Sequence, residues 1–475
     1  MTTAVRSALS HATLVACLLS LGRTSPAQET PSPDQAASSA PAAISPAANG
    51  TPYDPVAATN AYLATVSGEK RVRSDAYFEG GYWLQLWDFL LGVAVNLALL
   101  GTGLSHRMRN LAERLVRFRP VQTLLYWFQY LILTALVVFP MTVYEGFVRE
   151  HAYGLSNQAF GAWLGDQAKG LGVGLVLGGL FVTALYGVVR RLARTWALWG
   201  ALTMVALVVF GILIAPVFIA PLFNKYTRLA DPAVQGPILS LARAQGVEAR
   251  DVWVFDASRQ TKRVSANVSG FAGTMRISLN DNLLNRCSLA EIEAVMGHEV
   301  GHYVLNHVYK TILFLAVVIV IGFALLKWSF EKTAARWGAR WGIRGVGDPA
   351  GLPLALILLS AYFFVLTPAL NSWIRIDEAE ADLFGINSSG QPDGEARVDL
   401  MLGEYRKLDP SPLEEILLFD HPSGRSRILM AMRWKAEHLA EAEANASRAA
   451  EDDRRRGWSP ATAEAWAREH APSSR

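Results

Sequence analysis

Two histidines and a glutamate stand close together in the stretch VMGHEVGHYVLNH, residues 295–307. His298 and His302 are four residues apart, which places them about 40° apart on one face of a helix. Their imidazoles can converge on one ion, and zinc takes neutral nitrogen and carboxylate ligands in tetrahedral geometry. Glu299 follows His298 directly, where a base can take a proton from the attacking water. The spacing predicts the zinc site of a metalloprotease.

The same letters can arise without a metal site. In a chain with nine histidines, an H-E-x-x-H match is expected by chance about one time in a hundred. His307 lies further along and would be turned about 180° away from His298 on a continuous helix. We therefore expect His307 to be an ordinary polar helix residue. Leu305 and Val308 stand where a metzincin needs glycine and histidine, which excludes that class.

A third protein ligand must come from another segment, because a catalytic zinc keeps its fourth position open. The stretch NSWIRIDEAEAD, residues 371–382, is expected to be helical and offers Asp377, Glu378, Glu380 and Asp382. Glu378 and Asp382 are four residues apart and share a helix face. One of them can bind the metal while the other orients a histidine from behind. A solvated acidic face is the alternative for this segment.

Six apolar stretches must position these segments. They run roughly over 82–104, 122–144, 171–189, 196–222, 311–328 and 351–370. Each approaches or exceeds the about 20 residues that cross a hydrocarbon core, and six such runs predict membrane spans rather than buried soluble helices. Gly174 and Gly178 are spaced as in closely packed membrane helices, and a Gly-rich span without a special partner is the alternative.

The composition agrees with a membrane protein. Of the 475 residues, 51% are hydrophobic, and the net charge of +3 gives no case for a nucleic-acid partner. Cys17 and Cys287 are the two cysteines, which exclude a disulfide framework and a cysteine metal cluster. The sequence leaves the oligomeric state open.

The polar segments divide the chain further. Residues 1–27 predict an export signal peptide, with an uncleaved anchor as the alternative. Residues 28–80 begin rich in Ala, Pro and Ser and are expected to form a disordered linker. The remaining predicted divisions are spans 1–4 (81–222), a catalytic region (223–310), spans 5–6 (311–370), a second catalytic region (371–440) and a charged, solvated tail (441–475).

The first catalytic region contains predicted strands and the helix with the two histidines. The strand runs are VWVFD (252–256), RVSANVSGF (263–271) and MRISL (275–279), with a turn at Gly270 and Gly273. Ser288 and Glu291 form a capping box that opens the helix. The expected fold class is mainly α: a polytopic helical membrane protein with about six spans after the signal or anchor, and a small α+β zincin catalytic region.

Several segments together resemble the type I CAAX prenyl endopeptidases, which are integral-membrane zinc proteases of the gluzincin type. Besides the H-E-x-x-H stretch, the similar segments are VYEGFVREHAYGLSNQ (143–158), APLFNKYT (220–227), NSWIRIDEAEAD (371–382) and HPSGRSR (421–427). The resemblance covers nearly the whole chain after residue 80. It implies helices around an intramembrane chamber with the zinc site at one end.

The resemblance implies a role for each matching residue of the metal site. His298, His302 and Glu378 would bind one zinc ion (Zn2+) per chain, and Glu299 would be the general base. No other cofactor is implied.

The resemblance also assigns supporting roles. Asp382 would support a zinc histidine, and His421 would stabilise the tetrahedral oxyanion with Arg427 behind it. Asn267 would hold the substrate backbone on an exposed strand edge, where main-chain hydrogen bonds supply affinity. The neighbours of Asn267 differ from the histidine and aromatic residues usual in the family, and a signal-like run replaces the family's usual first span.

The expected activity is that of a membrane-embedded zinc metalloendopeptidase that cleaves membrane-associated or prenylated, CAAX-type peptides. A quality-control protease for membrane proteins is one alternative, and a non-catalytic binding scaffold is another. The intact Glu299 argues against the scaffold. The expected partners are a peptide or membrane-protein substrate and the lipid bilayer.

The charges of the connecting loops predict an orientation. The loops 105–121 and 329–350 and the turn at 190–194 are rich in Arg and Lys and fall on one side of six spans. Cytoplasmic loops carry this excess of positive charge. Together with the signal-like start, this predicts a bacterial inner-membrane protein whose catalytic region faces the periplasm.

Overall fold

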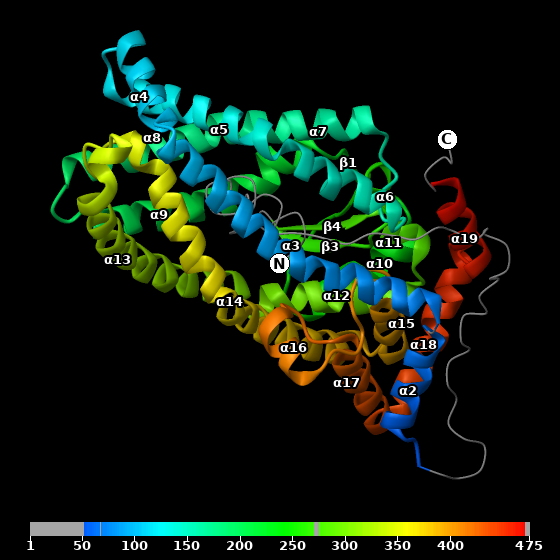
Figure 1. Ribbon diagram of the computed structural model, residues 1–475. Coiled ribbons are helices and arrows are strands. Elements are labelled where there is room, and N and C mark those ends of the chain that lie inside the picture. The colour runs from blue at the N-terminus through cyan, green and yellow to red at the C-terminus, as the bar shows by residue number, and fades with distance from the viewer. Residues whose placement is uncertain (1–51, 67, 270–274, 471–475) are drawn as a thin grey trace.

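The computed structural model describes residues 52–66, 68–269 and 275–470. The predicted signal peptide or anchor, the start of the predicted linker and the turn at Gly270 and Gly273 lie outside the described residues. Within the described part, long helices dominate and four short strands form one sheet (Figure 1). The expected fold class, mainly α with a small α+β region, is confirmed.

Within the described residues, six helical stretches are long and apolar enough to cross a membrane, which confirms the predicted spans. Large apolar side chains such as Leu136, Leu313 and Val365 are exposed on them, as lipid-facing positions require. The main helices of the stretches are α3 (Glu69–Gly101), α5 (Arg119–Val143) with α6 (Glu150–Ala152), α7 (Phe160–Val173) with α8 (Gly179–Arg191), α9 (Trp196–Ile214), α13 (His307–Trp341) and α14 (Leu352–Ser389).

The sixth span and the acidic segment of the predicted site form one continuous helix. α14 has 38 residues, which at 1.5 Å per residue gives about 57 Å, against a hydrocarbon core of about 30 Å. The helix therefore continues without a break through residue 370, where the sequence predicted the boundary between the sixth span and the second catalytic region. A single rod carries the carboxylates from the membrane into the catalytic region.

The two spaced glycines of the third span pack against α5. A methyl group added at Gly178 would come within 2.7 Å of the Trp127 ring. The indole N–H of Trp127 donates to the carbonyl of Gly174 at 3.1 Å. The missing side chains let the two helices approach closely, so the prediction of close packing is confirmed.

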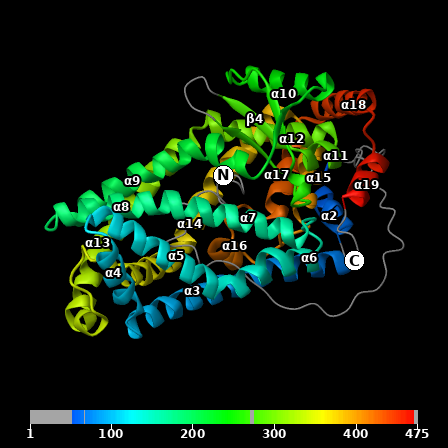
Figure 2. The same ribbon diagram turned by 90° about the horizontal axis from the view of Figure 1, so that it is seen from above.

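The basic connections between spans gather at one end of the helical bundle (Figures 1 and 2). The helix α4 (Leu104–Leu115), the turn after α8 and the turn between α13 and α14 meet there. Arg344 pairs with Glu113 at 2.7 Å, and Arg190 donates to the carbonyl of Gly347 at 2.8 Å. The strands and α12, which belong to the predicted catalytic region, lie at the opposite end of the molecule.

The catalytic region contains a sheet with strand order β1-β2-β4-β3. The parallel pair β2–β4 is flanked by antiparallel β1 and β3, so β3 is an edge strand. The strand β1 was not predicted, because three residues are too few to show an alternating pattern. The strands are β1 (Tyr226–Arg228), β2 (Val252–Phe255), β3 (Ala266–Ser269) and β4 (Arg276–Asn280).

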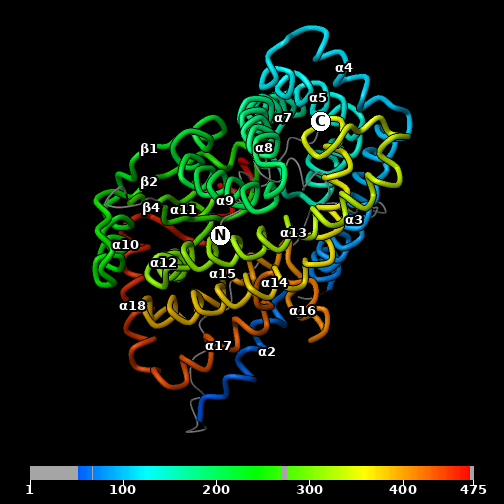
Figure 3. Tube along the Cα trace, turned by 90° about the vertical axis from the view of Figure 1, so that its left-hand side faces the viewer, coloured from blue at the N-terminus to red at the C-terminus, as the bar shows by residue number. Residues whose placement is uncertain are grey.

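The helix α12 (Leu289–Val304) lies against the sheet and opens with the predicted capping box of Ser288 and Glu291. Its residues Ile292, Met296 and Val300 are fully buried in a core shared with β4, α10 (Pro232–Ala244) and α11 (Asp281–Arg286). In Figure 3 the sheet, α12, α14 and α17 (Gly424–Glu437) follow one another as layers. The histidines of α12 therefore lie between the sheet and α14.

The C-terminal segment is less solvated than predicted. The prediction of a solvated tail over 441–475 is wrong for α18 (Leu439–Arg455), because Ala442 and Ala449 are buried. Asp453 also accepts a hydrogen bond from the backbone N–H of Leu289 at 2.9 Å. A stripe of small alanines makes a weak apolar pattern, which explains the error. The neighbouring helices are α15 (Pro392–Leu402), α16 (Pro412–Leu418) and α19 (Pro460–Glu469).

The predicted disordered linker is wrong over its last part. α2 (Pro55–Thr65) buries Tyr62 and Leu63 in a core shared with α17, and the Tyr62 hydroxyl donates to Asp393 at 2.7 Å. α3 already begins at Glu69. An isolated helix of this length is marginal in water. Its docking against α17, which the local sequence does not show, is what stabilises it.

Candidate active site

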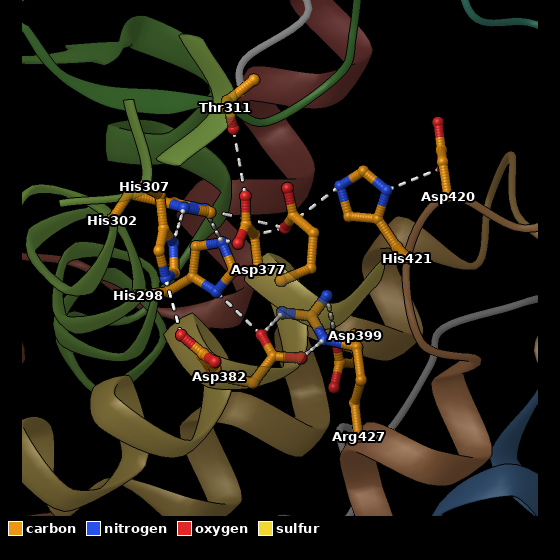
Figure 4. A network of polar contacts seen from close by, with 12 residues as sticks. His298, His302, His307, Thr311, Asp377, Asp382, Asp399, Asp420, His421 and Arg427 are labelled. Atoms are coloured by element: carbon orange, nitrogen blue, oxygen red, sulfur yellow. Dashed lines mark hydrogen bonds and ion pairs between the residues drawn. The ribbon is translucent and has the colours of Figure 1, made fainter. Parts of the chain in front are cut away.

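The H-E-x-x-H residues lie where α12 crosses α14 (Figure 4). The Nε2 atoms of His298 and His302 are 3.0 Å apart, and both rings face the same point. Glycines allow the two helices to meet closely: a methyl group added at Gly297 would come within 2.8 Å of the Gly385 carbonyl oxygen. This contact brings the carboxylates of α14 within reach of the α12 histidines.

Glu378 of α14 supplies a third donor atom. Its Oε2 lies 3.3 Å from His298 Nε2 and 3.7 Å from His302 Nε2. Around a tetrahedral zinc with bonds of about 2.0–2.2 Å, neighbouring ligand atoms stand about 3.3–3.6 Å apart. The three separations of 3.0, 3.3 and 3.7 Å bracket this range, so the donors suit one zinc ion in chemistry and could reach its spacing with shifts of a few tenths of an ångström.

The other carboxylates of α14 point elsewhere. Asp377 and Glu380 form a separate group with His307. The ammonium of Lys310 lies 2.8 Å from Glu380 and balances its charge. The structure thus brings Glu378, rather than Asp377 or Glu380, to the two histidines of α12.

Asp382 lies directly behind His298 (Figure 4). Its Oδ1 is 2.7 Å from His298 Nδ1, and Arg427 donates to both of its oxygens at 2.6 and 2.9 Å. Arg427 also contacts Asp399 at 2.8 Å and Glu395 at 3.3 Å. The expected place of Arg427 behind His421 stays a prediction; the direct contacts of its guanidinium are with these buried carboxylates, and through Asp382 with the support of His298.

The structure overturns the expected position of His307. α12 ends at Val304, and Asn306 adopts a left-handed backbone with φ of 58°, so α13 starts at His307 in a new direction. The rotation of about 180° between His298 and His307, expected for one continuous helix, therefore does not apply. His307 Nδ1 lies 2.8 Å from His302 Nδ1, and His307 Nε2 lies 3.2 Å from Glu380 Oε2. His307 is buried and contacts a candidate ligand directly.

Glu299 lies between the three donor atoms and the edge strand β3. Burial raises the pKa of Glu299 to about 7, while the charge of His298 and a hydrogen bond from the Val268 backbone N–H act to lower it. That N–H therefore points away from β4, on the free side of the strand. Asn267 also lies on β3, opposite Ser278 of β4, which is the edge position that the resemblance implies.

The two histidines of α12 differ in their electrostatics. Burial lowers the pKa of His302 to about 3, which keeps its ring neutral. Burial acts in the same direction on His298, but hydrogen bonds with Asp382 and Glu378 outweigh it and raise the pKa to about 10. A histidine binds a metal as the neutral imidazole, so metal binding at this site displaces a proton from His298.

His421 reaches the same site from the loop after α16. Its Nε2 lies 3.2 Å from Glu378 Oε2, and its Nδ1 lies 2.7 Å from Asp420 Oδ1. Burial and the nearby charge of Arg406 lower the pKa of His421 to about 4, against the two carboxylates. A cavity of about 130 Å³ opens here, lined by Glu299, Glu378 and His421 among others.

Two further residues besides His307 position the site and were not predicted from the sequence. Arg375 of α14 donates to the carbonyl oxygens of Glu415 at 2.9 Å and Phe419 at 2.5 Å, and so ties the loop of His421 to the helix of Glu378. Asp399 is the second: it contacts Arg427, which in turn donates hydrogen bonds to Asp382. The spacing of Arg375 ahead of Glu378 gave no sign of this contact, but the unfavourable position of Asn306 inside a helix could have indicated the break before His307.

Comparison with known proteins identifies the family. Residues 58–225 match the family described as "CAAX prenyl protease N-terminal, five membrane helices", and residues 228–435 match "Peptidase family M48". An uncharacterized metalloprotease of Bacillus subtilis is 31% identical over 389 residues, which cover 81% of this chain and 89% of the relative. The chain belongs to the type I CAAX prenyl protease family.

Further members of the CAAX prenyl protease family show the same relationship. CAAX prenyl protease 1 of Saccharomyces cerevisiae is 30% identical over 204 residues, 42% of this chain and 45% of that protein. The Arabidopsis thaliana homolog is 29% identical over 287 residues, 60% and 67% of the two chains. The crystal structure of S. mikatae Ste24p shares the fold, with a TM-score of 0.64 and 22% identity over 76% of this chain and 88% of that chain. The chain is thus an integral membrane metalloprotease.

Proposed function

We propose that the chain is a zinc-dependent endopeptidase with one zinc ion and no other cofactor. The observation that carries the proposal is the convergence of donor atoms from His298, His302 and Glu378 at spacings of 3.0, 3.3 and 3.7 Å, with Glu299 beside them. Membership of peptidase family M48 supports metalloprotease chemistry.

In the proposed mechanism, the zinc ion, Glu299 and His421 each have a separate role. Zinc, when bound, supplies a Lewis acid that polarises the peptide carbonyl and acidifies water. Glu299 accepts a proton from the attacking water on its carboxylate and returns it to the nitrogen of the leaving amine. His421 lines the cavity, and with its hydrogen on Nε2 it donates a hydrogen bond to the oxyanion that develops at the carbonyl.

The two ligand histidines are proposed to be oriented from behind. A ring that binds metal through Nε2 carries its hydrogen on Nδ1. His298 then donates from Nδ1 to Asp382, and His302 donates to the bare Nδ1 of His307. His307 in turn donates from Nε2 to Glu380. This assignment leaves one donor and one acceptor in every contact.

The substrate is proposed to be a peptide that binds in extended form along β3. The N–H of Val268, on the outer side of this edge strand, faces Glu299, and main-chain pairing at such an edge supplies affinity. Asn267 would hold the peptide backbone there. The six adjoining spans favour membrane-associated peptides, and relatives named CAAX prenyl proteases favour prenylated, CAAX-type ones.

The location is proposed to be a bacterial inner membrane, with the catalytic region on the periplasmic side. The basic connections meet at one end of the spans and the catalytic elements lie at the other, and basic ends stay in the cytoplasm. A relative in Bacillus subtilis supports a bacterial setting.

Two substitutions test the chemistry. Glu299→Gln removes the base and keeps the ligands, so zinc should stay near one ion per chain while peptide cleavage falls by about 10³-fold or more. Glu378→Ala should lose both zinc and cleavage. Metal content by mass spectrometry and turnover of a peptide library distinguish the two variants. Near-normal turnover by Glu299→Gln would refute the mechanism.

Reporter fusions test the orientation independently. Alkaline phosphatase joined after Asn282 of α11 should be active, because it would lie outside the cytoplasm. The same enzyme joined after Ala335 of α13 should be inactive. The reverse pattern would overturn the periplasmic location and leave the proposed chemistry unaffected.

A further inference from the structure

One arginine of the active-site cavity, Arg406, has Asp399 in its electrostatic neighbourhood but forms no direct ion pair with a described residue. Arg406 lines the cavity together with Glu299 and His421, and its charge acts directly on His421. Its guanidinium makes no hydrogen bond or ion pair with any residue that the structure describes. A half-buried guanidinium whose N–H groups have no direct acceptor gains from an anion that supplies one, so this position suits an anionic ligand.

The other cavity arginines are already satisfied. Arg263 pairs with Glu150 at 2.8 Å, and Arg427 pairs with Asp382 and Asp399. Neither guanidinium is therefore available to a ligand. Arg406 differs from both, although all three line the same cavity.

The loop that carries Arg406, residues 403–411, is itself held firmly. Ser74 of α3 donates its hydroxyl to the carbonyl oxygens of Gly403 and Arg406. Every other charged side chain of the loop has a partner at 2.6–3.0 Å: Glu404 with Arg286, Lys407 with Glu79 and Glu414, and Asp409 with Arg425. The backbone under Arg406 is thus fixed while the guanidinium remains unpaired, which is the arrangement of a preorganised ligand-binding group.

We propose that Arg406 binds a carboxylate of the peptide substrate and so makes the protease selective for peptides that carry one near the scissile bond. This inference rests on the proposed endopeptidase function. The planar guanidinium matches a carboxylate with two parallel hydrogen bonds. The carboxylate can be the C-terminus of the peptide or the side chain of Asp or Glu, and both present the same chemistry to Arg406.

Four matched peptides test the proposal. They share one sequence around the cut and end in a free carboxylate, an amide, an amide with an internal Asp, or an amide with Asn at that position. The unsubstituted protein should cleave its preferred carboxylate peptide about 10- to 100-fold better in kcat/KM than the neutral counterpart, as expected for charge-assisted hydrogen bonds. Which carboxylate peptide is preferred identifies the source of the anion.

The variant Arg406→Gln should remove this preference: whatever its effect on turnover through His421, the ratio of kcat/KM for the carboxylate peptide to that for the neutral peptide should fall to about one. Arg406→Lys should keep part of the preference for carboxylate peptides, because lysine keeps the positive charge but lacks the planar guanidinium. Arg454→Gln is the matched control: it removes the same charge from α18, where the side chain is 74% exposed, and should leave the preference intact.

Two results would overturn the proposal. One is an unsubstituted protein that treats all four peptides alike. The other is an Arg406→Gln variant that keeps the full carboxylate preference, even if it slows all four peptides, because Arg406 would then act on the reaction and not on the carboxylate. Binding of the peptides to the Glu299→Gln protein, followed by fluorescence anisotropy, separates this proposal from the function itself. A carboxylate preference in binding without any cleavage by the unsubstituted protein would refute the protease function and leave the Arg406 site standing.

Discussion

His298 and His302 lie on the same face of α12, but the residues behind them differ. Behind His298, Asp382 and Arg427 are 2% and 8% exposed and belong to a buried cluster of charges. Behind His302, His307 is 4% exposed, but its partner Glu380 is 46% exposed and pairs with Lys310. The chain of contacts behind His298 therefore ends at buried residues, and the chain of contacts behind His302 ends at a side chain that is exposed to solvent.

This difference shows that distance alone does not rank such contacts. The two supporting contacts measure 2.7 Å for Asp382 and 2.8 Å for His307. In the interior, removing one member of a charged network leaves the other uncompensated. At the surface, water replaces a missing partner, and ion pairs contribute little. We therefore expect the effects of substitution to follow burial, from Asp382 through His307 to Glu380.

Asp382→Ala should have the largest effect of the three. Zinc should bind about 10- to 100-fold more weakly, because His298 loses its orienting acceptor. The free energy of unfolding should also fall by about 3 kcal/mol, because Arg427 stays buried with one carboxylate fewer. Competition with a chromogenic chelator measures the first quantity, and denaturant unfolding of the metal-free protein measures the second.

Asp399→Asn is the control for that variant. Asp399 contacts Arg427 at 2.8 Å but not His298, so the variant should lose stability while zinc affinity stays within about 3-fold of the unsubstituted protein. Equal loss of zinc in the two variants would mean that loosening of the buried cluster, rather than orientation of His298, controls the metal.

His307→Leu should have an intermediate effect. Without the acceptor for the Nδ1 hydrogen of His302, zinc affinity should fall by about 10-fold. His307→Asn should recover most of the loss, because its side-chain oxygen can accept a hydrogen bond near the position of Nδ1. Chelator competition measures both. If the Leu variant binds zinc as tightly as the unsubstituted protein, His307 is a neighbour of the site and not a support.

Glu380→Ala should have the smallest effect. The carboxylate is 46% exposed, so water can take its place at His307, and zinc affinity should change by less than about 3-fold. The same chelator competition applies, with Lys310→Met as the matched variant that removes the other half of the surface pair. If Glu380→Ala lowered zinc affinity as much as His307→Leu does, burial would not predict the order of the three effects.

Parts of the site follow from local patterns, and parts do not. The pair His298 and His302 could be predicted, because four residues of helix place two side chains on one face regardless of the rest of the fold. The role of His307 could not, because the break at Asn306 changes the direction of the chain and brings back a residue that a straight helix would carry away. The error over α2 has a similar origin, since its order depends on α17.

The six spans, the capping box at Ser288 and the histidine pair follow from local patterns in the sequence, because each depends on neighbours along the chain: apolar length, a local hydrogen bond or helical period. Which carboxylate of α14 meets the histidines, where Arg427 points and which cavity arginine is left unpaired follow from how distant segments pack. Those outcomes depend on the close crossing of α12 and α14 at Gly297 and Gly385, and on burial, which sets the strength of every charge contact around it.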